Sequence, residues 1–98
     1  MTENEHILTT LGEEGVEISK EVSKALRFGL DDIDPRDPQG PSNKGKIIDE
    51  INDLLGVVDL LVERGILPTW WFSKHQQSAK REKVLKFIEI ARSKGTIQ

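Results

Sequence analysis

Apolar residues recur at helical spacing along three stretches of the chain. At about 100° per residue, each stretch gathers its apolar positions into one arc of a helix. The first stretch runs from about His6 to Arg27, with an arc of Ile7, Leu11, Ile18, Val22, Ala25 and Leu26. The arc of the second is Ile47, Ile51, Leu54, Leu55, Val58, Leu61 and Val62, and that of the third is Val84, Phe87, Ile88 and Ala91. The pattern predicts an all-α fold, an antiparallel helical bundle of three principal helices.

Glycines, prolines and capping residues set the expected ends of these helices. Gly29 ends the first helix, and Gly65 and Gly95 end the others. Prolines disfavour helix in the residue before them, so residues 30 to 43 should form a loop with room for one helical turn, within an insertion of about 30–45. Ser42 or Asn43 caps the second helix, a linker spans about 66–73, and Ser73 caps the third. We expect one domain over residues 1–98.

Four acidic residues interrupt the apolar arcs of the first two helices. A step of three residues keeps Glu14 and Glu17 on one side of the first helix, and Glu50 and Asp53 on one side of the second. Other acids, among them Asp49, Asp59 and Glu63, fall on an ordinary solvated face.

If the two helices pack antiparallel, the four carboxylates converge and repel one another unless protons or a cation neutralise them. Such hard oxygen ligands suit Mg²⁺, or Mn²⁺ in its place. We therefore expect Glu14, Glu17, Glu50 and Asp53 to bind metal. Glu13 and Glu21, one turn before and one turn after Glu17, are both candidates for the general base.

The paired motifs Glu13-Glu14-Gly15-Val16-Glu17 and Glu50-Ile51-Asn52-Asp53 resemble those of the MazG-like nucleoside triphosphate pyrophosphohydrolases, over roughly residues 7 to 67. The resemblance implies a short, phage-type member that cleaves (d)NTP to (d)NMP and pyrophosphate with Mg²⁺. The five acids in these motifs would then form the catalytic site. The chain departs from compact members by its Pro- and Asp-rich insertion, which leaves the substrate open.

Basic and aromatic residues add further candidates. Lys80 and Lys83 on the third helix could bind substrate phosphates, and Arg27 and Lys46 are weaker candidates. The alternative is that such a lysine only lays its aliphatic stem along the apolar arc and keeps its ammonium in water. In relatives such residues often come from a neighbouring subunit. The aromatic run Trp70-Trp71-Phe72 fits a core, an oligomer interface or base stacking.

Composition narrows the function classes further. The chain has 98 residues, a net charge of −3 and no cysteine, which excludes disulfides, thiol nucleophiles and thiolate zinc sites. The mild charge argues against a chain whose whole surface binds nucleic acid. With no signal peptide or membrane-spanning run, we expect a cytoplasmic protein, in the host cytoplasm if phage-encoded.

A chain this short should complete its core as a homodimer or homotetramer. The alternative to an enzyme is a non-catalytic helical module whose basic third helix contacts nucleic acid or an acidic partner.

Overall fold

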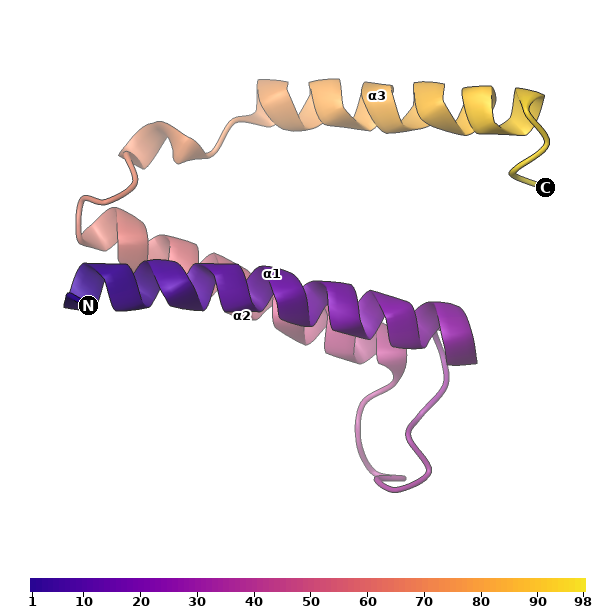
Figure 1. The fold of residues 1–98 in the computed structure, drawn as a ribbon, viewed down its shortest axis with the longest axis horizontal. Coiled ribbons are helices and arrows are strands. Elements are labelled where there is room, and N and C mark those ends of the chain that lie inside the picture. Colours follow the sequence, from indigo (N-terminus) through magenta and orange to yellow (C-terminus); the bar gives the residue numbers. More distant parts are fainter. The chain divides into compact units, whose positions relative to one another are not determined.

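The computed structural model describes all 98 residues, and it is all-helical (Figure 1). Its elements are α1 (Glu3–Phe28), α2 (Asn43–Glu63), a short 3₁₀ helix η1 (Thr69–Trp71) and α3 (Lys74–Ser93). The predicted all-α fold with three principal helices is confirmed. The chain divides into two compact units, Met1–Pro68 and Thr69–Gln98, and each is described by itself.

Helix α1 begins at Glu3, before the predicted start at His6. The cause is a capping box, in which the Thr2 hydroxyl accepts from the Glu5 amide while the Glu5 carboxylate accepts from the Thr2 amide. The helix ends at Gly29, whose φ of +101° favours glycine. Its ψ of 149° is extended, so Gly29 does not adopt the left-handed helical conformation that glycines commonly have after a helix.

Helix α2 begins at Asn43, so the last residues assigned to the 30–45 insertion belong to the helix instead. Ser42 explains the difference, because its hydroxyl accepts from the Gly45 amide at 3.1 Å and fixes the first turn. The loop before it forms no helical turn. Its two ends are joined by an isolated antiparallel bridge between Ile33 and Ser42.

Helices α1 and α2 run antiparallel along their length (Figure 1). At one end Arg64 pairs with Glu3 at 3.2 Å, and at the other the Asn43 side-chain amide donates to the Gly29 carbonyl at 2.8 Å. The apolar core between the helices is small, and Leu61 is its one fully buried side chain. The buried apolar residues are Ile7, Ala25, Val58 and Leu61.

The second unit consists of η1 and α3. Ser73 caps α3 as predicted, with its hydroxyl accepting from the Gln76 amide at 3.0 Å. Within this unit nothing covers the apolar side of α3, and Val84 and Phe87 are 46% and 55% exposed. Trp71 and Phe72 contact each other edge to face, with ring centroids 5.6 Å apart.

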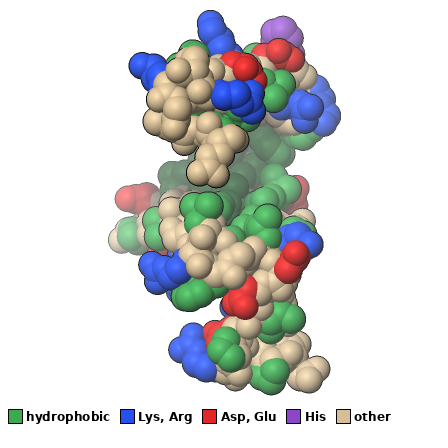
Figure 2. All heavy atoms as spheres, turned by 90° about the vertical axis from the view of Figure 1, so that its right-hand side faces the viewer, with side chains coloured by type: hydrophobic (Ala, Val, Ile, Leu, Met, Phe, Trp, Pro, Cys, Tyr) green, Lys and Arg blue, Asp and Glu red, His purple; other side chains and the backbone are tan.

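Hydrophobic side chains are visible at the surface among charged ones (Figure 2). Even so, none of the helices combines the length and apolar character that a membrane crossing requires.

Candidate functional site

The antiparallel pairing of α1 and α2 brings carboxylates from both helices together. Glu14, Glu50 and Asp53 each offer one oxygen, and these oxygens lie within 4.8 Å of one another. Glu17, Glu21 and Glu50 form a second group with the same spacing. The two groups share Glu50 and between them contain all four of the acids expected to bind metal. We call these five residues the carboxylate cluster.

Two oxygens of the carboxylate cluster are buried without a hydrogen-bond partner. They are Oε2 of Glu14 and Oε2 of Glu21, and Glu21 as a whole is only 6% exposed. Its other carboxylate oxygen, Oε1, lies 3.6 Å from the Lys24 ammonium. A buried carboxylate oxygen with no donor is costly unless the group is protonated or meets a cation.

The protonation of Glu50 reflects its crowded position. Partial removal from water raises the pKa of Glu50, and the charge of Asp53 and the neighbouring carboxyls of Glu14 and Glu17 raise it further. These causes act against the ionised form. A cation bound among the same oxygens would favour the ionised form, so a proton and a metal ion would compete for this site.

Glu13 and Glu21, the two candidates for the general base, lie in different surroundings. Glu13 is exposed and belongs to neither carboxylate group. Glu21 lies inside the cluster and is its most buried member. Its spacing of four residues from Glu17 and seven from Glu14 places all three on one face of α1, and this spacing is the sequence signal for a fifth ligand.

The basic residues expected to bind phosphate are divided among several surroundings. Lys46 lines a pocket beside the cluster. Arg27 is exposed, with its guanidinium 5.7 Å from the centre of the Phe28 ring. Lys80 and Lys83 lie on α3 in the second unit, where the Lys83 ammonium is 6.0 Å from the centre of the Phe87 ring. A phosphate-binding role for the α3 lysines remains a prediction.

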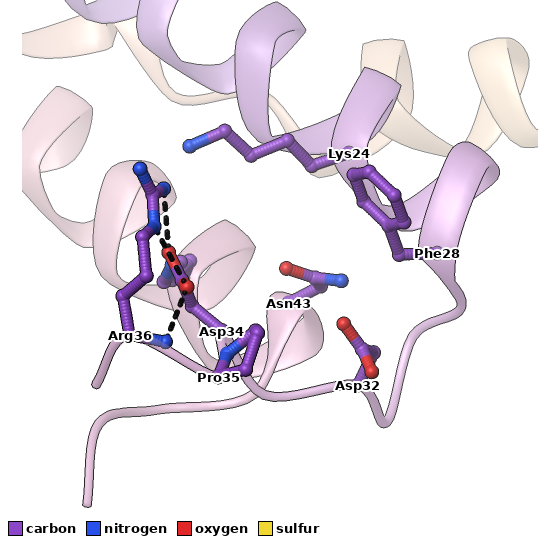
Figure 3. A pocket seen from close by; sticks show the side chains of 8 residues that line it. Lys24, Phe28, Asp32, Asp34, Pro35, Arg36 and Asn43 are labelled. Atoms are coloured by element: carbon purple, nitrogen blue, oxygen red, sulfur yellow. Dashed lines mark hydrogen bonds and ion pairs between the residues drawn. The ribbon is translucent and has the colours of Figure 1, made fainter. Parts of the chain in front are cut away.

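The pocket lies where the loop between α1 and α2 meets their ends, and its volume is about 460 Å³ (Figure 3). It is lined by Lys24, Phe28, Asp32, Asp34, Pro35, Arg36, Asn43 and Lys46. Of these, Lys46 was expected from the sequence to bind phosphate. Arg36 donates to Asp34 at 3.1 Å through Nε and at 2.8 Å through Nη2. This bidentate pair, helped by Lys46, holds the pKa of Asp34 well below its usual range.

No family model, no curated protein and no solved structure matches this chain. The resemblance to the MazG-like enzymes therefore rests on the two acidic motifs and the helical pattern that carries them.

Proposed function

We propose that the protein is a Mg²⁺-dependent nucleoside triphosphate pyrophosphohydrolase. The observation that carries the proposal is the carboxylate cluster, in which two helices bring five acids together and leave two of their oxygens buried without a donor. A surface that is merely charged would turn these oxygens to water. Five converging carboxylates at a core margin instead fit a site that binds a divalent cation.

The donor set fits Mg²⁺ or Mn²⁺ in its chemistry. Both ions prefer hard oxygen ligands, and the cluster offers only carboxylates. Glu14, Glu50 and Asp53 would hold one cation, and Glu17 and Glu21 with the shared Glu50 would provide a second set of oxygens. When bound, the metal supplies positive charge that binds the triphosphate and favours ionisation of the attacking water.

The residues of the chain would then orient and neutralise the substrate. The oxygen of water attacks the α-phosphorus, the bond from that phosphorus to the bridging oxygen breaks, and pyrophosphate leaves with the bond's electron pair. The attacking water gives up its proton as the monophosphate forms. Glu21 and Glu13 are the two candidates to accept it, and Glu21 is the one that lies within the cluster.

The test is product identification on a panel of ribo- and deoxyribonucleoside triphosphates with Mg²⁺. We expect monophosphate and pyrophosphate in equal amounts, no product with EDTA, and none from the Glu50→Gln variant. Diphosphate with orthophosphate would indicate an ordinary phosphatase and contradict the proposal. If no triphosphate is hydrolysed and α3 instead binds nucleic acid without Mg²⁺, in a salt-sensitive way, the alternative of a binding module is correct.

A further inference from the structure

Along one face of α1 the side chains change from acidic to basic to aromatic. Glu17, Glu21, Lys24 and Phe28 follow one another at steps of four, three and four residues, which keeps all of them on the same side. The order is two carboxylates, then an ammonium, then an aromatic ring. Lys24 lies beside Glu21 at 3.6 Å, so the ammonium borders the carboxylate cluster directly.

Helix α2 carries a matching row in the opposite direction. Asn43, Lys46 and Glu50 are spaced by three and four residues, again on one face. Because the helices are antiparallel, the shared carboxylate Glu50 faces the acids of α1. Lys46 and Asn43 then lie with Lys24 and Phe28 in the pocket. The carboxylate cluster therefore continues into a basic and then an aromatic region.

Two of the three basic side chains in the pocket remain available to an anion. Arg36 is held by Asp34 through three hydrogen bonds, one of them from its backbone amide, and so forms a fixed wall. Lys46 has no ion pair within 4.0 Å, and Lys24 makes only the long contact with Glu21. Figure 3 shows Lys24 extending over the pocket toward Arg36, with Phe28 on the opposite side.

Asn43 adds a hydrogen-bonding group at the centre of the pocket. It is 4% exposed, and its Nδ2 donates to the Gly29 carbonyl at 2.8 Å, which fixes the orientation of the amide. Its side-chain oxygen is directed into the pocket (Figure 3). A ligand in the pocket would thus meet a fixed acceptor in a cavity that is also lined by an aromatic ring.

We propose that this pocket holds the nucleoside end of a nucleotide, with the base stacked on Phe28 and the α-phosphate between Lys24 and Lys46. The assignment rests on the proposed function for the identity of the ligand. It adds the direction in which the substrate lies: the base toward the loop, and the β- and γ-phosphates toward Asp53. The insertion between the two motifs then forms part of the substrate site.

The opposite direction would separate the β- and γ-phosphates from the cations that the proposed function assigns to the carboxylate cluster. The β- and γ-phosphates carry most of the negative charge of a triphosphate and have no apolar surface. In the pocket Phe28 and Pro35 would gain no contact from these phosphates. A base has the apolar faces that suit the ring, and stacking tolerates any base.

The test measures binding of each product separately, in EDTA and again with Mg²⁺, because products cannot turn over. Each of the four nucleoside monophosphates, and pyrophosphate, is titrated by calorimetry into the wild type and into Phe28→Ala, Phe28→Leu and Phe72→Ala. Phe28 is the last residue of α1 and 59% exposed, so these variants should fold, which circular dichroism checks. Phe72, 53% exposed in the second unit, is the matched control.

We expect both Phe28 variants to weaken monophosphate binding about tenfold, in line with the usual value of base stacking, and to leave pyrophosphate binding unchanged. Phe72→Ala should match the wild type. The inference is overturned if no monophosphate binds, if Phe28→Ala binds it as the wild type does, or if the Phe28 variants weaken pyrophosphate equally. The proposed function can fail separately. If monophosphates bind through Phe28 but no triphosphate is hydrolysed with Mg²⁺, the hydrolase activity is refuted and the nucleoside-binding pocket is supported.

Discussion

Glu50 is the residue on which the two carboxylate groups meet. It belongs to both groups, and burial and the neighbouring acids raise its pKa. In the unfolded chain Glu50 loses its proton near the ordinary value of 4.5, whereas in the folded chain it keeps the proton to higher pH. The folded state therefore binds more protons than the unfolded state within that window, and folding stability falls as pH rises through it.

The Glu50→Gln variant isolates this effect. The quantity to follow is the free energy of unfolding of the variant minus that of the wild type, measured without metal. This difference should increase as pH rises from about 4.5 through the raised pKa of Glu50, and it should be constant at higher pH. Urea unfolding in EDTA at a series of pH values measures the difference. A difference that does not vary with pH would show that Glu50 titrates as an ordinary surface carboxyl.

Amide substitutions at the other ligands test the role of each acid in the chemistry. Glu14→Gln, Glu17→Gln and Asp53→Asn nearly keep shape but remove a charge, so triphosphate hydrolysis should fall by orders of magnitude while helicity persists. Glu21→Gln should also lower it, because Glu21 is buried within the cluster. Glu63→Gln, exposed at the end of α2, is the control and should keep wild-type activity. Equal rates in all five variants would contradict the metal assignment.

At the scale of elements, the sequence predicts the helices well because their signals are local. Ser42 and Ser73 cap α2 and α3, and Gly65 and Gly95, with φ of +72° and +77°, follow their ends. The early start of α1 could also be predicted from the sequence, because Thr2 and Glu5 have the spacing of a capping box.

The pocket and the burial of Glu21 could not be predicted in the same way. Both depend on contacts between distant residues. Arg36 becomes a pocket wall only because the loop folds back and places it near Lys46, and the tie between Asn43 and Gly29 fixes where that loop begins and ends. A helical wheel places Glu21 at a margin but does not show how closely α2 covers it.

Packing between α1 and α2 should depend most on Leu61. Its side chain is fully buried, so Leu61→Ala should lower the free energy of unfolding by about 2–5 kcal/mol through lost contacts and a cavity. Leu55, on the same helix but 45% exposed, is the matched control and should lose clearly less on replacement by alanine. Thermal or urea unfolding measures both variants, and equal losses would show that α1 and α2 do not pack as described.

At the scale of the whole molecule, the apolar surface exceeds what the core uses. Only four apolar residues are buried, while Trp70, Val84, Leu85 and Phe87 are exposed. We predict that a second copy of the chain covers part of this surface, giving a twofold-symmetric dimer or a dimer of dimers. Light scattering after size exclusion should give at least twice the 11.1 kDa of one chain. A stable monomer at micromolar concentration would contradict this prediction, and would require any phosphate contact of Lys80 or Lys83 to come from the same chain.

The central claim is that the carboxylate cluster binds divalent cations, and a Mn²⁺ titration followed by calorimetry tests it most directly. The wild type should bind Mn²⁺ and Mg²⁺ should compete, with about 2.7 kcal/mol of added stability at a hundredfold excess over the dissociation constant. Glu50→Gln should lose most of the affinity, because it removes the negative charge of the residue that both groups share, and Glu63→Gln should keep it. If the wild type binds no Mn²⁺, or if Glu50→Gln binds it equally well, the cluster is not a metal site and the proposed chemistry is wrong.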